Sequence, residues 1–322
     1  MREITIKDIG PIRIGQTEDR AAGTGCTVFI CENGMPAGVD IRGGGPASRE
    51  SQLLNPLMSA EEIHAIVLAG GSAFGLGASN GVMEYLEERG YGYDVGVTKV
   101  PLTVQADIFD LKVGSKDRRP DPAMGYEAAR CAFEEDNYKD GNYGVGCGAT
   151  VGKVKGPAYA MKSGIGSYAV QVGELKVGAV VVVNAFGDVF DHKTGQKIAG
   201  ILKPDGSGFD NAIERMAESI EPMDTKFAAN TTLAVVMTNA AFDKAHLCKI
   251  AGMAHDGYAR AISPVHTTKD GDSIYAVSLG DLMADLNLVG TLAAETVSEA
   301  IIRAVTSADS AYGFPAVKDL KF

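Results

Sequence analysis

Apolar, β-branched segments spaced irregularly along the chain most restrict the folds that it can adopt. Residues 27–31 and 65–69 (TVFIC and AIVLA) are typical of short buried strands, and 174–186 is the strongest apolar strand, with Asn184 near its end. Further strands are expected at 231–240 and 273–279. We expect helices at 78–89, 208–219, 241–258 and about 281–307. Because strands and helices do not alternate regularly, the pattern favours a layered α+β fold over a doubly wound dinucleotide-binding fold.

Glycine is more abundant than usual, at 40 of 322 residues, or about 12% against an ordinary share of about 7%. The remaining composition is globular, with 45% hydrophobic and 22% charged residues. The surplus therefore indicates many tight turns and close backbone contacts. Length alone suggests roughly two domains at about 150 residues each. However, no repeat or Pro/Ser-rich linker divides the chain, and one large sandwich is equally compatible with its length.

The net charge of −11 argues against nucleic acid and anionic membranes as main partners. No apolar run approaches the length of about 18 residues that a membrane span needs, and the N-terminal MREITIKDIG lacks the apolar region of a secretory signal. The cysteines contain no Cys-x-x-Cys pair, which predicts reduced thiols rather than disulfides or a zinc site. We therefore expect a cytoplasmic protein. The cysteines are Cys26, Cys31, Cys131, Cys147 and Cys248.

Several common catalytic motifs are absent. Residues 70–74 (GGSAF) lack the last glycine of a nucleophile elbow, and Gly152-Lys153 lacks the remainder of a P-loop. The chain has no G-x-G-x-x-G that opens a helix after a strand, and no H-E-x-x-H. The five histidines show no metal-ligand spacing, and we expect most of them on the surface or on helices. They are His64, His192, His246, His255 and His266.

Asn230-Thr231-Thr232 lies between a polar connection at 221–230 and an apolar strand. In one interpretation the asparagine closes a turn and the threonines begin the strand. In the other, the Thr231 hydroxyl attacks the Asn230 carbonyl, the ester hydrolyses, and Thr231 becomes a new N-terminus. Its α-amine, with an ordinary pKa of about 7.7–8.0, would then act as the base for its own hydroxyl. The sequence around this site alone leaves both interpretations open.

Seven segments, in order along the chain, are informative together: GGGPASRESQLL (43–54), VLAGGSAFGLGASNGV (67–82), PLTVQADIFDL (101–111), GNYGVGCGATVGK (141–153), VGAVVVVNAFGD (177–188), NTTLAVVMTNA (230–240) and ARAISPVHTTKDGDSIYAVS (259–278). They resemble the self-processing D-aminopeptidase/β-aminopeptidase family, an S58-like family of N-terminal-nucleophile-like hydrolases. The resemblance covers nearly the whole chain, and the branch that the chain resembles most is the nylon-oligomer (6-aminohexanoate-oligomer) hydrolase. The resemblance implies an αββα four-layer sandwich.

The resemblance also implies roles for individual residues. Thr231 matches the nucleophile that processing exposes, and Asn230 matches the residue on the other side of the cleaved bond. Lys153, which we expect on a strand at 149–155, matches a lysine near the nucleophile, where a cation helps to keep the Thr231 amine neutral. Asn184 matches an asparagine that donates an amide N–H to the oxyanion.

Asp270 and Asp272 match the paired acids of the nylon-hydrolase branch. Two carboxylates two residues apart point the same way on extended backbone, so one can hold Lys153 charged while the other orients the amine or hydroxyl of Thr231. The local alternative is a turn, because Asp-Gly is a common turn signal. A metal site is the weaker interpretation, since no third ligand accompanies the two acids.

Two further features concern the substrate side of the site. Gly71 and Ser72 lie in a glycine-rich loop at 70–77, which we expect to approach the cleft and to contribute oxyanion or substrate contacts. Phe109 is the best match for a tyrosine that some family members place near the nucleophile. A phenol donor is therefore expected to be missing here.

Together these features predict one αββα domain over 1–322 that cuts itself into chains of residues 1–230 and 231–322. The resemblance implies that the paired chains form a homo-oligomer of heterodimers. The expected substrates are small peptides, amino-acid amides, β-peptides or ω-amino-acid oligomers, and no metal or cofactor is expected. The alternatives are an acyltransferase that resembles the self-cleaving ornithine acetyltransferases, and an unprocessed binding protein of the same fold.

Overall fold

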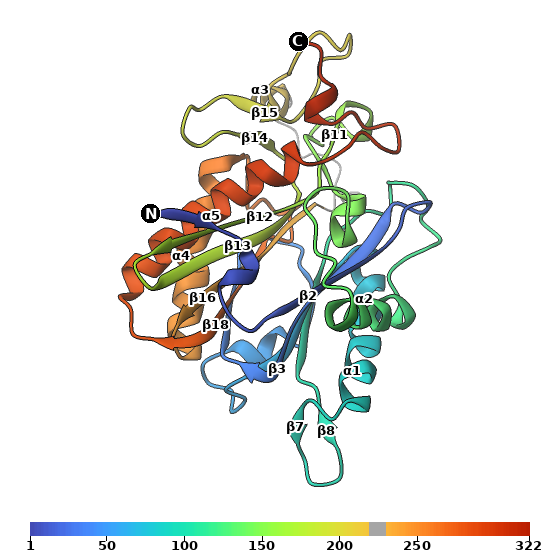
Figure 1. Ribbon diagram of the computed structural model, residues 1–322. Coiled ribbons are helices and arrows are strands. Elements are labelled where there is room, and N and C mark those ends of the chain that lie inside the picture. Colours follow the sequence, from blue (N-terminus) through green and yellow to red (C-terminus); the bar gives the residue numbers. More distant parts are fainter. Residues whose placement is uncertain (219–229) are drawn as a thin grey trace.

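A six-stranded sheet forms one of the two central layers of the fold (Figure 1). The computed structural model describes residues 1–218 and 230–322. The paired strands of this sheet are antiparallel except for β16 and β18, which run parallel. In spatial order the strands are β1 (Arg2–Ile4), β12 (Ile165–Val172), β13 (Leu175–Asn184), β16 (Thr231–Ala240), β18 (Ser273–Leu282) and β4 (Ala37–Ile41).

A five-stranded sheet forms the second central layer, and its only parallel pair among the described strands is β6 with β9. In spatial order the strands are β2 (Arg13–Asp19), β3 (Thr24–Met35), β6 (Ile63–Ala69), β9 (Thr103–Asp107) and β5 (Ala47–Arg49).

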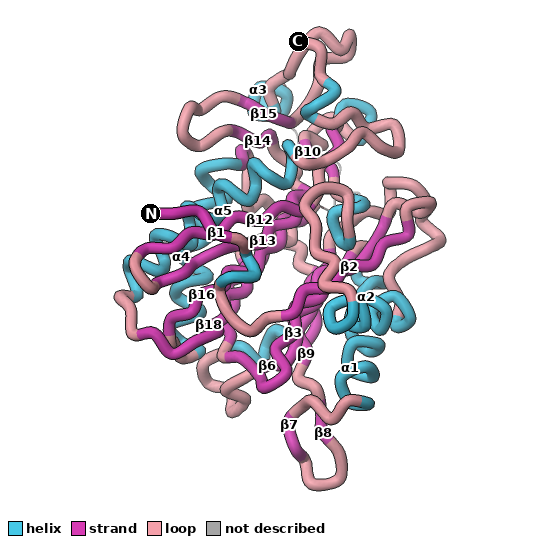
Figure 2. Tube along the Cα trace, viewed as in Figure 1, coloured by secondary structure: helices cyan, strands magenta, loops and turns pink. Residues whose placement is uncertain are grey.

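Two pairs of helices cover the outer faces of the sheets, as Figures 1 and 2 show. Helices α4 (Lys244–Ala261) and α5 (Leu286–Thr306) pack on the six-stranded sheet. Helices α1 (Ala78–Glu88) and α2 (Pro122–Glu134) pack on the five-stranded sheet. The order of layers is helix, sheet, sheet, helix, which confirms the predicted αββα sandwich.

Strand β13 shows why the central strands are apolar at almost every position. Val180 and Val182 belong to the core between the two sheets, whereas Val181 and Val183 belong to the core under α4 and α5. Successive side chains of a strand point to opposite faces, so a strand covered on both sides has no position for a polar residue until its end. The unbroken run that ends at Asn184 follows from this double burial.

Smaller elements extend one end of the sandwich, near the C-terminus in Figure 1. A three-stranded sheet comprises β15 (Lys197–Ala199), β14 (Asp188–Phe190) and β17 (Ile262–Ser263), with β10 (Thr150–Val151), β11 (Met161–Lys162) and α3 (Ala212–Ala217) nearby. A hairpin of β7 (Tyr93–Asp94) and β8 (Lys99–Val100) projects from the other end. The 3-10 helices are η1 (Ile6–Asp8), η2 (Ser51–Leu54), η3 (Ser72–Gly77), η4 (Gly144–Gly148), η5 (Pro157–Tyr159) and η6 (Val317–Asp319).

Three sequence expectations need correction. The strand expected at 149–155 comprises only Thr150–Val151, because Gly152 has a φ of 74° and turns the chain. The helix expected from 241 begins at Lys244, since the Asp243 carboxylate caps it by accepting from the His246 N–H. The helix expected at 208–219 is Ala212–Ala217, and residue 219 and the connection at 221–229 lie outside the described residues.

None of the helices in the described ranges combines the length and the hydropathy needed to cross a membrane.

Candidate active site

The ends of three neighbouring strands bring the predicted residues together. Thr231 is the first residue of β16 and is paired directly with Asn184, the last residue of β13. Because β16 and β18 are parallel, the segment before β18, which holds Asp270 and Asp272, meets the start of β16 at the same edge. Asn230 and Asp270 form a parallel bridge there. Thr231 is 3% exposed, so the cluster is buried.

Three hydrogen bonds hold Asn230 next to Thr231, and two of them end on the Asn230 carbonyl oxygen. The Thr231 hydroxyl donates to the Asn230 carbonyl oxygen, and the Gly271 N–H donates to the same oxygen at 2.9 Å. The Asn230 N–H donates to the Lys269 carbonyl at 3.0 Å. The hydroxyl therefore lies against the carbonyl that it would attack in self-cleavage.

Asp272 connects β16 to a histidine. Its Oδ1 accepts the Thr232 N–H at 2.8 Å. Its Oδ2 accepts the backbone N–H of His266 at 3.1 Å and lies 2.9 Å from His266 Nδ1. A carboxylate oxygen accepts in such a pair, so Nδ1 carries the proton. Asp272 thus fixes the residue next to Thr231.

Asp270 lies on the other side of Gly271 and is anchored separately. Its Oδ2 accepts from the Thr267 N–H at 3.2 Å and from the Thr267 hydroxyl, and its Oδ1 accepts the Phe186 N–H at 3.4 Å. Burial raises the pKa of Asp270 to about 6, and the negative charge of Asp272 adds to this effect. This carboxyl group therefore exchanges its proton close to neutral pH.

Lys153 reaches the same strand ends from the turn after β10. Its N–H donates to the Phe186 carbonyl at 3.0 Å, and its Nζ donates to Asn184 Oδ1 at 2.6 Å and to the Asn184 carbonyl at 3.0 Å. Burial lowers the pKa of Lys153 to about 7, while the nearby Asp270 charge opposes the shift. Lys153 and Asp270 therefore both titrate near neutrality, as acid–base groups in active sites do.

Asn184 joins the two sheets. Its Oδ1 accepts from Lys153 and from the Thr150 N–H at 3.2 Å, and its Nδ2 donates to the Phe109 carbonyl at 3.1 Å. One of its two amide hydrogens is thus engaged within the chain, and one remains for the predicted oxyanion contact. That role stays a prediction. Phe109 thus meets Asn184 through its backbone carbonyl, and the expectation of a missing phenol donor at this position stays a prediction.

Gly71 and Ser72 lie where the glycine-rich loop leaves β6. The Gly71 N–H donates to Asp110 Oδ1 at 2.7 Å, and the Ser72 N–H donates to the Ile108 carbonyl at 2.9 Å. Both backbone donors are therefore engaged within the chain, which leaves the Ser72 hydroxyl as the group available for the predicted contact.

Three residues that the sequence did not single out belong to this neighbourhood. They are Gly271, which lies between the two acids, His266 and Asp110. Most of the histidines were expected on the surface or on helices, whereas His266 lies in a loop against Asp272 and its side chain is 18% exposed. Burial raises the pKa of Asp110 to about 6, and Thr24 Oγ1 donates to this residue at 2.6 Å. All three residues lie within segments that resemble the family, at 101–111 and 259–278. The spacing of these residues in the sequence did not indicate their contacts.

A possible metal cluster lies elsewhere. Within residues 1–218 and 230–322, the grouping of possible ligand atoms that lie close together is Glu127, Cys131 and Glu135, on and after α2. Arg130 Nη2 pairs with Glu127 Oε1 and with Glu135 Oε1, both at 2.6 Å. An internal cation therefore already neutralises these acids, and none of the predicted site residues belongs to the group.

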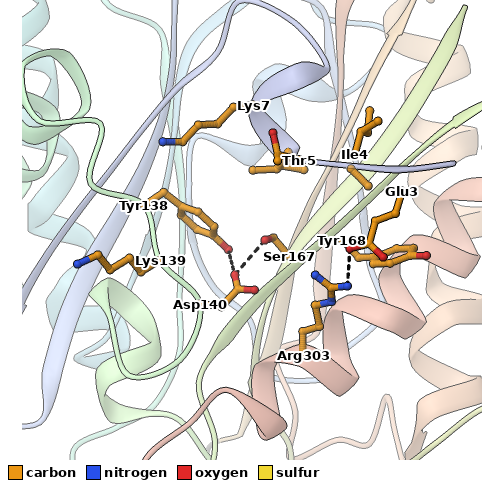
Figure 3. Close-up of a pocket in the computed structure, with 12 residues that line it drawn as sticks. Glu3, Ile4, Thr5, Lys7, Tyr138, Lys139, Asp140, Ser167, Tyr168 and Arg303 are labelled. Carbon is orange, nitrogen blue, oxygen red and sulfur yellow. Dashed lines mark hydrogen bonds and ion pairs between the residues drawn. The ribbon is translucent and has the colours of Figure 1, made fainter.

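Figure 3 shows a separate pocket of about 510 Å³ between the N-terminal strand, β12 and α5. Tyr138 and Ser167 both point to Asp140, and each hydroxyl donates to its Oδ1 at 2.9 Å. Arg303 at the rim pairs with Glu3 at 2.6 Å. Asp140 is thus satisfied by Tyr138 and Ser167, and Arg303 by Glu3, and the pocket contains none of the predicted site residues.

The chain is similar to known sequences over nearly its whole length. Residues 5–318 match the sequence profile of peptidase family S58. An uncharacterized aminopeptidase of Mycobacterium tuberculosis (strain ATCC 25618 / H37Rv) is 36% identical, with 98% of this chain and 97% of the relative covered. A 6-aminohexanoate-oligomer endohydrolase of Agromyces sp. (strain KY5R) is 29% identical, with 94% of this chain and 86% of the relative covered.

Two solved structures share the fold. A β-aminopeptidase from Burkholderia sp. superposes with a TM-score of 0.66 at 18% identity, with 96% of this chain and 88% of the other covered. The L-aminopeptidase D-Ala-esterase/amidase of Ochrobactrum anthropi, described as a new variant of the Ntn-hydrolase fold, has a TM-score of 0.69 at 17% identity, with 94% and 86% covered. At these identities the likeness concerns the fold alone.

Proposed function

Because this chain belongs to peptidase family S58, and is therefore a hydrolase of peptide or amide bonds, we propose that Thr231 is its nucleophile. We further propose that the chain exposes this residue by cutting its own Asn230–Thr231 bond. The observation that carries the proposal is the hydrogen bond from the Thr231 hydroxyl to the Asn230 carbonyl oxygen, at the buried start of β16. This contact places the attacking oxygen beside the bond to be cut.

In the proposed cleavage, the Thr231 oxygen adds to the Asn230 carbonyl carbon, and the acyl group moves from nitrogen to oxygen. Water then hydrolyses the ester, which leaves a carboxylate on Asn230 and a free amine on Thr231. Lys153 supports proton transfer, since its pKa of about 7 lets it accept and release protons at neutral pH.

In turnover, the free Thr231 amine acts as the base for its own hydroxyl, which attacks the substrate carbonyl. An acyl-enzyme forms, the Asn184 amide supports the oxyanion, and water completes the reaction. The proposal requires no cofactor. The proposed mechanism has the three roles of a catalytic triad. The Thr231 hydroxyl is the nucleophile, its own amine is the base, and Asp272 and Asp270 are the acids that orient them.

The substrate class that we propose is a small amide with a free amine. The candidates are small peptides, amino-acid amides, β-peptides and ω-amino-acid oligomers, of which the last is the substrate named for the Agromyces relative. Two buried carboxyl groups, Asp270 and Asp272, lie near the reacting bond. Negative charge of this kind favours a substrate that carries an ammonium group.

The decisive experiment compares Thr231→Val with Thr232→Val by intact mass after expression. Both changes remove one buried hydroxyl and keep the branched shape of the side chain. Thr232 is the matched control, because its hydroxyl oxygen has no hydrogen-bond partner within the described residues. We expect wild type and Thr232→Val to yield fragments 1–230 and 231–322, and Thr231→Val to stay whole.

Each rival function gives a different result. A wild-type chain that stays whole and hydrolyses no amide would contradict the proposal and support an unprocessed binding protein. A cleaved chain that transfers acetyl from acetylornithine to glutamate, without hydrolysing amides, would support the acyltransferase.

A further inference from the structure

The Asn230 carbonyl oxygen accepts a second hydrogen bond that does not come from the nucleophile. The Gly271 N–H donates to it at 2.9 Å. When the Thr231 oxygen attacks, its proton leaves and its own hydrogen bond to this carbonyl is lost. The Gly271 N–H remains in place while negative charge develops on the carbonyl oxygen, which is the task of an oxyanion donor.

The Gly271 peptide is held rigidly from several directions. The Asp270 carbonyl accepts the Gly45 N–H at 2.9 Å, and the Asp272 carbonyl accepts the Arg42 N–H at 3.0 Å. The Ser273 hydroxyl donates to the Gly271 carbonyl at 2.9 Å. Donors that are fixed before the reaction need no reorganisation when charge appears, so they stabilise the transition state efficiently.

Position 271 also requires glycine for a steric reason. Its φ lies outside the left-handed region, so the backbone conformation alone would accept other residues. A Cβ built on Gly271, however, would lie 2.7 Å from Thr231 Oγ1 and 3.0 Å from the Gly45 carbonyl oxygen. A side chain there would push the hydroxyl away from the carbonyl that it must attack.

We propose that Gly271 is a catalytic residue of self-cleavage: its N–H holds the oxyanion and its missing side chain leaves room for the attacking hydroxyl. This inference rests on the proposed cleavage at Asn230–Thr231. A bond forms between Thr231 Oγ and the Asn230 carbonyl carbon, and the carbonyl electron pair moves to the oxygen that Gly271 holds. Collapse breaks the carbon–nitrogen bond, and the hydroxyl proton ends on the Thr231 nitrogen. Water alone is then consumed when the ester hydrolyses.

The N–H can be removed without adding atoms. Glycolic acid incorporated at position 271 by nonsense suppression replaces the N–H with an ester oxygen, and cleavage is followed by intact mass during cell-free synthesis. We expect self-cleavage about 10²–10³-fold slower than in wild type, the usual effect of losing one oxyanion donor. The control is the same replacement at the exposed turn residue Gly206, whose N–H donates to the Lys203 carbonyl at 3.0 Å. Cleavage of the 271 ester within about threefold of the Gly206 ester would overturn the donor role.

A second pair of variants tests the steric requirement. In Gly271→Ala the new Cβ meets the Thr231 hydroxyl, whereas in Gly208→Ala, outside the predicted site, the nearest atom is Lys203 Nζ at 3.9 Å. We expect Gly271→Ala to cleave at least about tenfold more slowly and Gly208→Ala to cleave at the wild-type rate, with equal protease resistance of the uncut chains as the folding check. Equal rates for both alanines would overturn the steric role.

These results remain separable from the proposed function. If Thr231→Val is still cut at the same bond, the nucleophile assignment fails and Gly271 has no attack to serve. If Thr231→Val stays whole while both changes at position 271 cleave normally, only the present inference fails.

Discussion

At the scale of single residues, the lowered pKa of Lys153 makes the stability of the folded chain depend on pH. Its pKa lies near 7 because burial disfavours the ammonium form. The folded state therefore binds fewer protons than the unfolded chain between pH 7 and the ordinary lysine pKa of about 10.4. Lys153 thus lowers the stability of the folded state at neutral pH, and this penalty disappears as the pH rises through that window.

We predict that Lys153→Met slows self-cleavage about 10²-fold or more, in the range typical of a lost acid–base group. It should also remove the inflection near pH 7 from a plot of cleavage rate against pH. Lys155→Met, at an exposed lysine of the same turn, is the control and should keep the wild-type profile. An unchanged inflection in Lys153→Met would assign the titration to another group, and Asp270 would be the next candidate.

His266 is predicted to act through Asp272. His266→Ala removes the ring donor that lies 2.9 Å from Asp272 and should slow cleavage about tenfold. His266→Asn keeps a side-chain N–H, and asparagine tolerates the φ of 55° at this position. We therefore expect the asparagine variant to cleave within about threefold of wild type. Equal losses in the two variants, measured by intact mass over time, would contradict the positioning role.

The sequence identified Thr231, Lys153, Asn184, Asp270 and Asp272 as candidates through one resemblance, and the fold places them around one sheet edge. It did not identify Gly271 or His266, because their contacts depend on hydrogen bonds between segments that are distant in sequence. The position of Gly271 becomes meaningful only when β16 and β18 lie side by side. The local Asp-Gly turn signal gave no indication of this.

At the scale of secondary-structure elements, double burial made β13 and β16 predictable because it makes their sequences apolar, whereas β9 is also buried but has polar residues (TVQAD) and was missed. The runs that became β13 and β16 are covered on both faces, and their apolar patterns gave nearly the correct bounds. Strands β2 and β4 have exposed or half-exposed positions, and they were missed. Helix α2 was also missed, although Asp121 caps its start and Pro122 occupies its first position.

Helix α4 offers a prediction about packing, because it contains two glycines in different surroundings. A Cβ at Gly257 would lie 2.5 Å from the Ala294 carbonyl oxygen of α5, whereas a Cβ at Gly252 would meet the ends of two side chains, Asp40 at 3.1 Å and Arg42 at 3.7 Å. Gly257→Ala should therefore lower the free energy of unfolding by about 1–3 kcal/mol. Gly252→Ala should raise it by up to about 1 kcal/mol through helix propensity. Urea unfolding of the two variants checks this, and a stabilising Gly257→Ala would contradict the close packing of α4 on α5.

At the scale of the whole molecule, the proposed cut divides the strands of the six-stranded sheet between the two products. Residues 231–322 supply β16 and β18 at its centre, while residues 1–230 supply β12 and β13 on one side and β4 on the other. Each product would therefore have its strands paired with strands of the other. Neither product contains the complete six-stranded sheet, whereas the five-stranded sheet lies wholly within residues 1–230.

We predict that the two products elute together on size exclusion in native buffer and separate only in denaturant. Because we also propose an oligomer of processed heterodimers, native mass spectrometry should give whole multiples of the 33.6 kDa pair. The uncleaved Thr231→Val chain serves as the size reference. Fragment 231–322 eluting alone from freshly cut protein would contradict the interleaved arrangement.

The order of the strands in the six-stranded sheet determines when, during folding, the Asn230–Thr231 bond can be cut. Asp270, Gly271 and Asp272 follow Thr231 by about forty residues, and they reach it only after α4 has crossed over and β18 has paired with β16. A chain in which β18 has not paired with β16 therefore does not hold Asp270, Gly271 and Asp272 against the bond. If the proposed cleavage occurs, each cut molecule has folded at least once, and the ratio of cut to uncut chain in a cell extract measures folding yield without any added reporter.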